Sequence, residues 1–399
     1  MPAELTSTAF DTQPEMLQVQ QSSGSLFVGI PRETMLRENR VALTPSGVAT
    51  LTGHGHRVMV EKDAGIKSNF TDHEYAEAGA EIAYSAAKVF KADILLKVAP
   101  PTLDEIDMLH ANQVLISPLQ IPLISADYIN CLREKRVIAL AMEYIKDDVG
   151  SFPIVRIMSE MAGLSVMLTA GELLAKDKGP GILLGGVAGV PPTKVVILGA
   201  GVVGEFATRT ALGLGAEVRV FDNNIYKLMR LQHQVGRQLF TSAIDPATLA
   251  RELVSADVAI GAIHSKSGRT PMIVSEEIVS QMKRGSVIMD VSIDQGGCFA
   301  TSEVTTHDKP TFVRHDVTHY CVPNIASRVP RTASMAISNI ITPMLLKVEQ
   351  YSSLERLLQE SAGLLHGVYT YKGCLTNLYL SQRFQIKYTE LDLLITSHI

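Results

Sequence analysis

The sequence predicts an α/β protein built on two doubly wound, mainly parallel sheets. Two series of short apolar runs alternate with amphipathic stretches, the first starting at Leu26 and the second at Lys194. A segment rich in glycine and proline, residues 178–194, separates the two series and is the clearest loop of the chain. Short apolar runs are typical of strands buried on both faces, as in parallel sheets that helices cover on both sides.

Five apolar runs in the first series have the length and boundaries of buried strands. They are residues 26–30, 57–61, 93–98, 113–117 and 137–142. Between them, residues 45–51, 72–78 and 85–89 have the apolar spacing of helices. A long helix is expected from Val155 to Lys176, beginning near Pro153, because proline is favoured in a first helical turn.

Size and composition exclude several classes of protein. The chain has 399 residues, 46% of them hydrophobic and 19% charged, which suits two or three compact domains. A net charge of −5 provides no basic surface for nucleic acid. The four cysteines form no C-x-x-C pair, so we expect reduced thiols in a cytoplasmic protein and no metal site.

The N-terminal residues 1–24 are polar, and we expect them to be a disordered extension. They lack the basic and apolar regions of a signal peptide. No run reaches the roughly 18 uninterrupted apolar residues of a membrane span. The best candidate, residues 335–346, is short and interrupted by serine, asparagine and proline, so we expect no membrane partner.

The second series opens with a glycine-rich turn between a strand and a helix. Its expected strands are residues 194–198, 217–221, 257–263, 286–293 and 319–322. Gly199, Gly201 and Gly204 have the G-x-G-x-x-G spacing of a dinucleotide-binding Rossmann unit. In that unit the three glycines permit a tight turn, close approach of a pyrophosphate, and close packing of helix on strand.

The residues that follow this turn complete the pattern. Val202 and Val203 open the helix, whose N-terminal amides would face the phosphates. Asp222 ends the next strand, where a carboxylate accepts hydrogen bonds from the adenine ribose and repels a 2′-phosphate. The pattern predicts NAD rather than NADP as cofactor. The alternative is a packing turn without a ligand, which the surrounding strand, helix and acid disfavour.

Polar residues also follow the expected strands at their carboxyl ends, where open α/β sheets bind ligands. They are Arg40, Lys97 and Gln120 in the first series, and Asp294 and Asn324 in the second. Two cations beside a nicotinamide suit a small carboxylate substrate, because arginine binds a carboxylate bidentately and lysine as a point charge. For each residue alone a surface salt bridge is an equally good interpretation, and for Glu33 we expect no more than that.

With these residues in place, the sequence resembles the alanine dehydrogenase and nicotinamide nucleotide transhydrogenase α-subunit family over about Leu26 to Pro343. The matching motifs are VGIPRE (28–33), ENRVALTP (38–45), LLKV (95–98), MSEMAG (158–163), GILLGGVAGVPPTKVVILGAGVVG (181–204), MKRGSVIMDVSIDQGGC (282–298) and VPRTAS (329–334). The resemblance implies a flavodoxin- or Rossmann-like substrate domain, residues 25–152 with 331–399, and an inserted Rossmann NAD-binding domain, residues 153–330. It also implies a homo-oligomer, either a hexamer or a dimer.

The same resemblance implies roles for individual residues. Arg40 and Lys97 would hold the carboxylate of a small amino or 2-oxo acid, and Lys97 also its carbonyl oxygen. Asp294 matches the active-site aspartate of the dehydrogenases, an acid that the transhydrogenase branch lacks. Positions that line the substrate, the nicotinamide or its diphosphate are matched by Met158, Ser159 and Asn324.

Gln120 is where the chain departs from the dehydrogenases. They have a catalytic histidine in a motif like LHLA, whereas this chain has LQIP, and the transhydrogenase branch has glutamine there. An amide cannot exchange a proton near neutral pH, whereas an imidazole can. We expect Gln120 to donate a hydrogen bond to the substrate oxygen, and His264 is a candidate proton carrier.

The preferred hypothesis is an NAD-dependent dehydrogenase that converts L-alanine to pyruvate and ammonia. One alternative is a diverged dehydrogenase for another small amino or imino acid, which a panel of amino acids would reveal. Another is a non-catalytic regulatory protein, which would bind NAD without turnover. A transhydrogenase subunit is disfavoured by Asp294.

Overall fold

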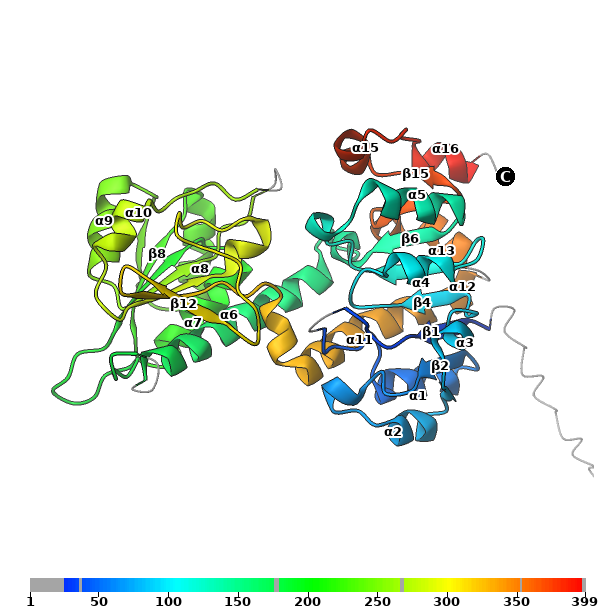
Figure 1. Cartoon of the computed structure of the whole chain (residues 1–399), viewed down its shortest axis with the longest axis horizontal. Coiled ribbons are helices and arrows are strands. Elements are labelled where there is room, and N and C mark those ends of the chain that lie inside the picture. The colour runs from blue at the N-terminus through cyan, green and yellow to red at the C-terminus, as the bar shows by residue number, and fades with distance from the viewer. Residues whose placement is uncertain (1–24, 36–37, 176–178, 266–268, 352–353, 397–399) are drawn as a thin grey trace, which may run out of the picture.

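The computed structural model describes residues 25–35, 38–175, 179–265, 269–351 and 354–396, which form two lobes joined by long helices (Figure 1). Each lobe contains one mainly parallel sheet with helices packed around it. The predicted class, α/β with two doubly wound sheets, is therefore confirmed. The expected disordered extension, residues 1–24, lies outside the described part of the chain.

The first sheet has eight strands in the order β15-β14-β6-β5-β4-β1-β2-β3. Its strands are β1 (Phe27–Ile30), β2 (Arg57–Glu61), β3 (Glu81–Ala83), β4 (Ile94–Leu96), β5 (Val114–Ser117), β6 (Ile138–Ala141), β14 (Val368–Tyr371) and β15 (Cys374–Leu375). Strands β1 to β6 run parallel, in the order of a Rossmann sheet rather than a flavodoxin sheet. The last two strands are antiparallel and extend the sheet beyond β6.

The helices of this lobe connect the strands and cover the sheet. They are α1 (Pro45–Gly53), α2 (Asp72–Glu77), α3 (Ala86–Val89), α4 (Leu103–Asp107), α5 (Ala126–Glu134), α12 (Val348–Tyr351), α13 (Leu354–Glu360), α14 (Ala362–Leu365), α15 (Leu378–Phe384) and α16 (Leu391–Thr396), with 3-10 turns η1 (Ile66–Ser68), η2 (Ile121–Leu123) and η3 (Met142–Tyr144). Ile94 and Leu96 belong to one apolar core and Leu95 to another, because successive side chains of a strand point to opposite faces. Both faces of the first sheet are therefore buried.

The second sheet has seven strands in the order β12-β13-β11-β10-β7-β8-β9. Its strands are β7 (Lys194–Leu198), β8 (Glu217–Phe221), β9 (Phe240–Ser242), β10 (Val258–Gly261), β11 (Val287–Asp290), β12 (Thr311–Arg314) and β13 (Val317–Tyr320). Its helices are α7 (Val202–Gly213), α8 (Ile225–Val235), α9 (Pro246–Val254) and α10 (Glu276–Ser280), with 3-10 turns η4 (Val291–Gln295) and η5 (Ile325–Arg328). Apart from the antiparallel edge strand β12, this is the Rossmann strand order.

Helix α6 (Pro153–Leu174) runs from one lobe into the other (Figure 1). Ile154 packs in the core of the first lobe, whereas Ala162 and Val166 pack in the core of the second. Gly163 lies so close to α7 that an added Cβ would meet the Val203 carbonyl oxygen at 2.5 Å. By length and composition α6 is the one helix among the described residues that could cross a membrane, a test that core helices of soluble proteins also pass.

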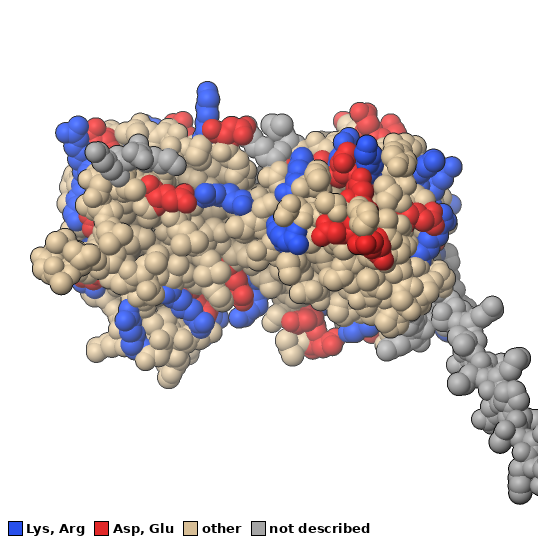
Figure 2. All heavy atoms as spheres, turned by 90° about the horizontal axis from the view of Figure 1, so that it is seen from below, with Lys and Arg blue, Asp and Glu red and all other residues tan. Residues whose placement is uncertain are grey.

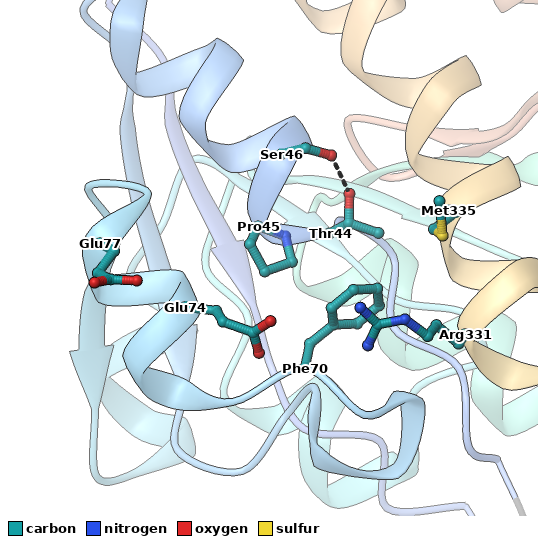
Figure 3. Close-up of a pocket in the computed structure, with 8 residues that line it drawn as sticks. All are labelled: Thr44, Pro45, Ser46, Phe70, Glu74, Glu77, Arg331 and Met335. Carbon is teal, nitrogen blue, oxygen red and sulfur yellow. Dashed lines mark hydrogen bonds between the residues drawn. The ribbon is translucent and has the colours of Figure 1, made fainter.

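Helix α11 (Pro330–Leu346) returns the chain to the first lobe. Ile337 and Ile341 enter the first core. At its beginning the Arg331 guanidinium lies over the Phe70 ring, 4.3 Å from the centroid, beside Glu74 (Figure 3). These side chains line a surface cavity of about 390 Å³, and the Arg331–Phe70 contact fastens the start of α11 to the first lobe.

The ten predicted strands all occur, with ends that differ by at most a few residues. The strands that the sequence did not reveal are β3, β9, β12, β14 and β15. Each has only two to four residues, too few to show a period; four of them are edge strands and β14 lies next to an edge strand.

Candidate functional site

The glycine-rich turn after β7 forms a cradle with room for a ligand. Gly199 has a φ of +108°, and an added Cβ would meet the Ala262 carbonyl oxygen at 2.3 Å. At Gly204 a Cβ would lie 1.8 Å from the Gly199 carbonyl oxygen, so helix and strand pack in direct contact. A Cβ on Gly201, in contrast, would meet nothing within 4 Å. The turn is thus closed on its protein side and open where a pyrophosphate would sit.

The start of α7 and the end of β8 provide the polar groups of this cradle. The backbone amides of Val202 and Val203 are in the first helical turn, where no intrahelical acceptor exists. The Asp222 carboxylate accepts hydrogen bonds from the amides of Ala200 (2.8 Å) and Asn224 (2.7 Å). A carboxylate has about four acceptor positions, so its orientation is fixed and acceptors remain for ribose hydroxyls. These residues fit a dinucleotide.

Arg40 lies in the segment after β1 and is buried between the lobes. Its Nε and Nη2 donate to Glu38 at 2.7 and 2.6 Å, a bidentate ion pair. Its remaining contacts are weak, with Nη1 3.4 Å from the Met158 sulfur and Nη2 3.4 Å from the Val98 carbonyl oxygen. Met158 on α6 therefore meets Arg40 directly. Ser159, the next residue of α6, is half-buried, and its contact with a cofactor stays a prediction.

Lys97 follows β4 and is 1% exposed. Its Nζ lies 2.9 Å from a Glu33 oxygen and 3.2 Å from a Glu105 oxygen. Burial alone would lower the pKa of Lys97, but the two carboxylates raise it above its ordinary value, so the ammonium stays charged. The expectation of a surface salt bridge for Glu33 is wrong, since Glu33 is buried and also accepts from the Val98 amide at 2.6 Å.

Asp294 lies in η4, directly after β11 of the second lobe. The surrounding protein raises the pKa of Asp294 to about 6, against the opposing effects of the Asn324 amide and the Arg40 charge. Its carboxyl is nevertheless reachable from solvent. Asp290 organises this loop by accepting hydrogen bonds from the Cys298 amide (2.9 Å) and the Ser302 hydroxyl (2.7 Å). Asp294 is thus an accessible acid with a pKa close to neutrality.

Asn324 connects the two lobes. It has a φ of +54° and begins η5 after β13. Its amide N–H donates to Asp294. Its side-chain Nδ2 donates to Glu38 at 3.1 Å. Four predicted site residues therefore meet at one place: Arg40, Met158, Asp294 and Asn324.

Gln120 lies at the same carboxyl edge, one strand away from Lys97. The Lys97 amide donates to Ile116 of β5, and Gln120 follows the end of that strand with a φ of +45°. The turn is held by Glu143, which accepts from the amides of Leu119 (2.9 Å) and Gln120 (3.1 Å). Burial raises the pKa of Glu143. The Gln120 side chain is partly exposed, and its contact with a substrate stays a prediction.

His264 follows β10 and is exposed. Partial burial and the Lys227 charge lower the pKa of His264, so the ring is neutral near pH 7. Among the described residues no group of three or more histidine, cysteine, aspartate or glutamate side chains could hold a metal ion.

Three glutamates of the site escaped the sequence interpretation: the buried Glu38 and Glu105 and the half-buried Glu143. Two of them left a signal. Glu105 completes a capping box with Thr102, a pattern visible as T-x-x-E at 102–105. Glu38 stands two residues before Arg40 in ENR. For Glu143, the contact with the turn at Gln120 became visible only in three dimensions.

The fold and these contacts are those of a two-lobed protein with a Rossmann-type nucleotide-binding lobe, in which predicted site residues of both lobes meet. Family models agree in detail: the N-terminal domain of alanine dehydrogenase/PNT matches residues 29–162 and the C-terminal domain matches residues 165–378. The chain belongs to the alanine dehydrogenase/PNT family.

Known proteins of this family cover nearly the whole chain. Alanine dehydrogenase 2 of Staphylococcus aureus (strain USA300) is 39% identical over 367 residues, 92% of this chain and 98% of the relative. A solved L-alanine dehydrogenase superposes with a TM-score of 0.85 at 35% identity, covering 90% of this chain and 99% of that one. A transhydrogenase from Sinorhizobium meliloti superposes with a TM-score of 0.75 at 25% identity, covering 88% and 99%.

A substitution at Gly201 should separate folding from cofactor binding. Because a Cβ there meets nothing within 4 Å, Gly201→Ala should fold normally, yet weaken NADH binding about tenfold or more by filling the pyrophosphate position. Thermal melting and NADH fluorescence titration measure the two effects. Gly213→Ala, also in open space but at the far end of α7, is the matched control and should bind NADH normally. Equal affinities in both variants would contradict the cradle.

Proposed function

We propose that this protein is an NAD-dependent dehydrogenase that oxidises L-alanine to pyruvate and ammonia. The observation that carries the proposal is the meeting of Arg40 and Asp294, from different lobes, beside a cradle that fits a dinucleotide. The family relatives named as alanine dehydrogenases support the choice of substrate. Four free thiols support a reducing, cytoplasmic setting.

In this proposal the first lobe binds the substrate. Arg40 offers the Nη1/Nη2 edge, whose contacts with Met158 and Val98 are weak, to the substrate carboxylate. Lys97 adds a point charge that Glu33 and Glu105 keep protonated and fixed. Asn324, which donates to Glu38, would contact the nicotinamide. These contacts hold the substrate Cα in one orientation, which is a large part of such catalysis.

The second lobe supplies the cofactor and the base. NAD, when bound, accepts the hydride from the substrate Cα. The residue after β8 is Asp222, not a cation that would neutralise a 2′-phosphate. This carboxylate favours NAD over NADP. Asp294 takes a proton from the substrate ammonium group and releases it to solvent. It then takes a second proton from the water that attacks the imine carbon, and returns it to the nitrogen as the carbinolamine breaks down to pyruvate and ammonia. A pKa of about 6 suits this role near neutral pH.

Gln120 is the observation that keeps a second substrate under consideration. An amide at this position can donate to a carbonyl or carbinolamine oxygen but cannot carry a proton. A diverged dehydrogenase for another small amino or imino acid would use the same Arg40 and Asp294. The rate of NADH formation is compared across a panel of small amino acids. A kcat/KM about tenfold higher for one amino acid than for L-alanine would identify that amino acid as the substrate.

The acid limb of the pH profile tests Asp294. Its pKa is raised to about 6, so its carboxylate form is present above that pH and lost below it. We expect kcat/KM for L-alanine oxidation to fall about tenfold per pH unit below about pH 6, and Asp294→Asn to lose about 10²–10⁴ in kcat. The exposed Asp127→Asn is the control. If Asp294→Asn is active and its kcat/KM still falls below about pH 6, Asp294 is excluded as the base.

Replacement of Gln120 by histidine tests the amide. Histidine tolerates a positive φ, so the turn at φ +45° should persist and the ring would regain a proton carrier. We expect Gln120→His to raise kcat for L-alanine by about tenfold or more. Asn112→His, at φ +64° and at the opposite end of β5, is the control. No gain would show that Gln120 is suited to its reaction as it is.

We also infer a homo-oligomer, formed through an apolar surface of the second lobe. Leu164 and Leu168 of α6 are 43% and 57% exposed, four residues apart on one helix face. The neighbouring Leu183, Val187 and Val190 are 58–66% exposed. Figure 2 shows few charged side chains over the middle of the lobe that carries them.

A charge on this surface should dissociate the assembly. Leu168→Glu would bury an unpaired carboxylate at the contact, and we expect light scattering to report a smaller particle than for the unaltered protein. Val149→Glu, at a residue 85% exposed in the first lobe, is the control. An unchanged mass for Leu168→Glu, or a monomeric unaltered protein, would contradict this interface.

A further inference from the structure

The Glu38 carboxylate accepts four hydrogen bonds where the two lobes meet. Its Oε1 accepts from the Arg40 amide (3.0 Å) and from Arg40 Nε (2.7 Å). Its Oε2 accepts from Arg40 Nη2 (2.6 Å) and from Asn324 Nδ2 (3.1 Å). It is 4% exposed. One carboxylate thus joins the substrate arginine to a residue of the nucleotide-binding lobe.

The geometry decides which edge of Arg40 is available to a substrate. The Nε/Nη2 edge is held by Glu38 through short, charge-assisted bonds, which are about twice as strong as neutral ones. Among the described residues, the contacts of the Nη1/Nη2 edge outside Glu38 are a thioether sulfur and a carbonyl oxygen, both at 3.4 Å. A carboxylate ligand displaces these weak acceptors far more easily than it displaces Glu38. Glu38 therefore orients Arg40 rather than competing for it.

The second half of the contact reaches the cofactor side. Asn324 Nδ2 is held by Glu38, while the Asn324 amide donates to Asp294. The left-handed backbone of Asn324, at φ +54°, fixes the direction of both donors. An unbroken series of contacts thus connects Arg40, through Glu38, to Asn324 and the loop of Asp294. A second contact joins the same two segments: the Asn39 amide donates to the Ser327 hydroxyl oxygen at 3.4 Å, a longer bond than that between Asn324 and Glu38.

We propose that Glu38 is a positioning residue that couples the two ligands: it aims Arg40 and links it through Asn324 to the nucleotide-binding lobe, so that a carboxylate substrate and the dinucleotide bind more tightly together than separately. This inference rests on the proposed function for the choice of ligands. Coupling of this kind is reciprocal and typically amounts to about 5- to 150-fold in affinity. It requires no proton transfer by Glu38.

The experiment measures binding without turnover. NADH fluorescence titrations of the full chain are made with and without pyruvate as the probe carboxylate. In the unaltered protein we expect pyruvate to lower the Kd of NADH by about fivefold or more. In Glu38→Gln we expect the Kd of NADH alone to stay within about twofold, and the effect of pyruvate to vanish. KM for L-alanine should rise about tenfold to a hundredfold, as for loss of a hydrogen bond to a charged group, with kcat changed less.

Two further variants keep the test decisive. Glu38→Asp retains the charge beside Arg40 but shortens the side chain, so it should fold and bind NADH while losing the pyruvate effect. Glu81→Gln removes a bidentate glutamate–arginine pair of the same kind, with Arg57 at 2.6 and 2.8 Å, on the surface of the same lobe. It should behave as the unaltered protein does.

Each outcome bears on one proposal. Coupling that is intact in both Glu38 variants, or a lower KM in Glu38→Gln, overturns the positioning role, and the lower KM would identify Glu38 as a competitor of the substrate. An unaltered protein in which pyruvate does not tighten NADH contradicts the coupling itself. A third outcome is that the unaltered protein shows the coupling, the Glu38 variants lose it, and no small amino acid is oxidised. That outcome supports the role of Glu38 and rejects the proposed reaction.

Discussion

Two buried cations at the carboxyl edge of the first sheet constrain the rest of the site. Lys97 is 1% exposed and Arg40 is 6% exposed. Removing an ammonium or guanidinium from water costs several kcal/mol unless carboxylates and hydrogen bonds replace the water. Glu33, Glu38 and Glu105 meet that need. Because the three come from two segments far apart in sequence, the site exists only when β1, β4 and α4 are already packed.

The same carboxylates also complete the local structure. Glu105 caps α4 through the Thr102 amide while it pairs with Lys97. Glu33 binds the Val98 amide while it pairs with the same lysine. Three carboxylates beside two cations leave no net positive charge to attract a substrate. Selectivity for a carboxylate ligand must then come from directed hydrogen bonds, chiefly those of the open Arg40 edge, rather than from the overall field.

The sequence revealed the features that are local or periodic. The ten central strands, α6 and the turn at Gly199 to Gly204 repeat a period or a spacing that three-dimensional packing reinforces. Strand β14, next to the edge strand β15, lacked such a signal, although it extends the first sheet beyond β6 and places α15 in the same apolar core as Leu119 and Ile121, beside Gln120. The polar site residues were recognisable by type and place. Their glutamate partners were not, because a charge pair across two lobes leaves no spacing in the chain.

Gln120 and Asp294 together limit the chemistry that this site can perform. Glu143 holds the Gln120 turn through backbone amides, so the side chain is free to act on a ligand but brings no titratable group. His264 is neutral near pH 7 and exposed, and no contact ties it to Arg40 or Asp294 among the described residues. Asp294 is then an acid of the site with a pKa, about 6, close to the working range. One carboxylate can serve the amine and the water in turn, because these proton transfers occur at different steps and the first proton can leave to solvent between them. In the proposed mechanism Asp294 therefore supplies both proton transfers without a histidine at position 120.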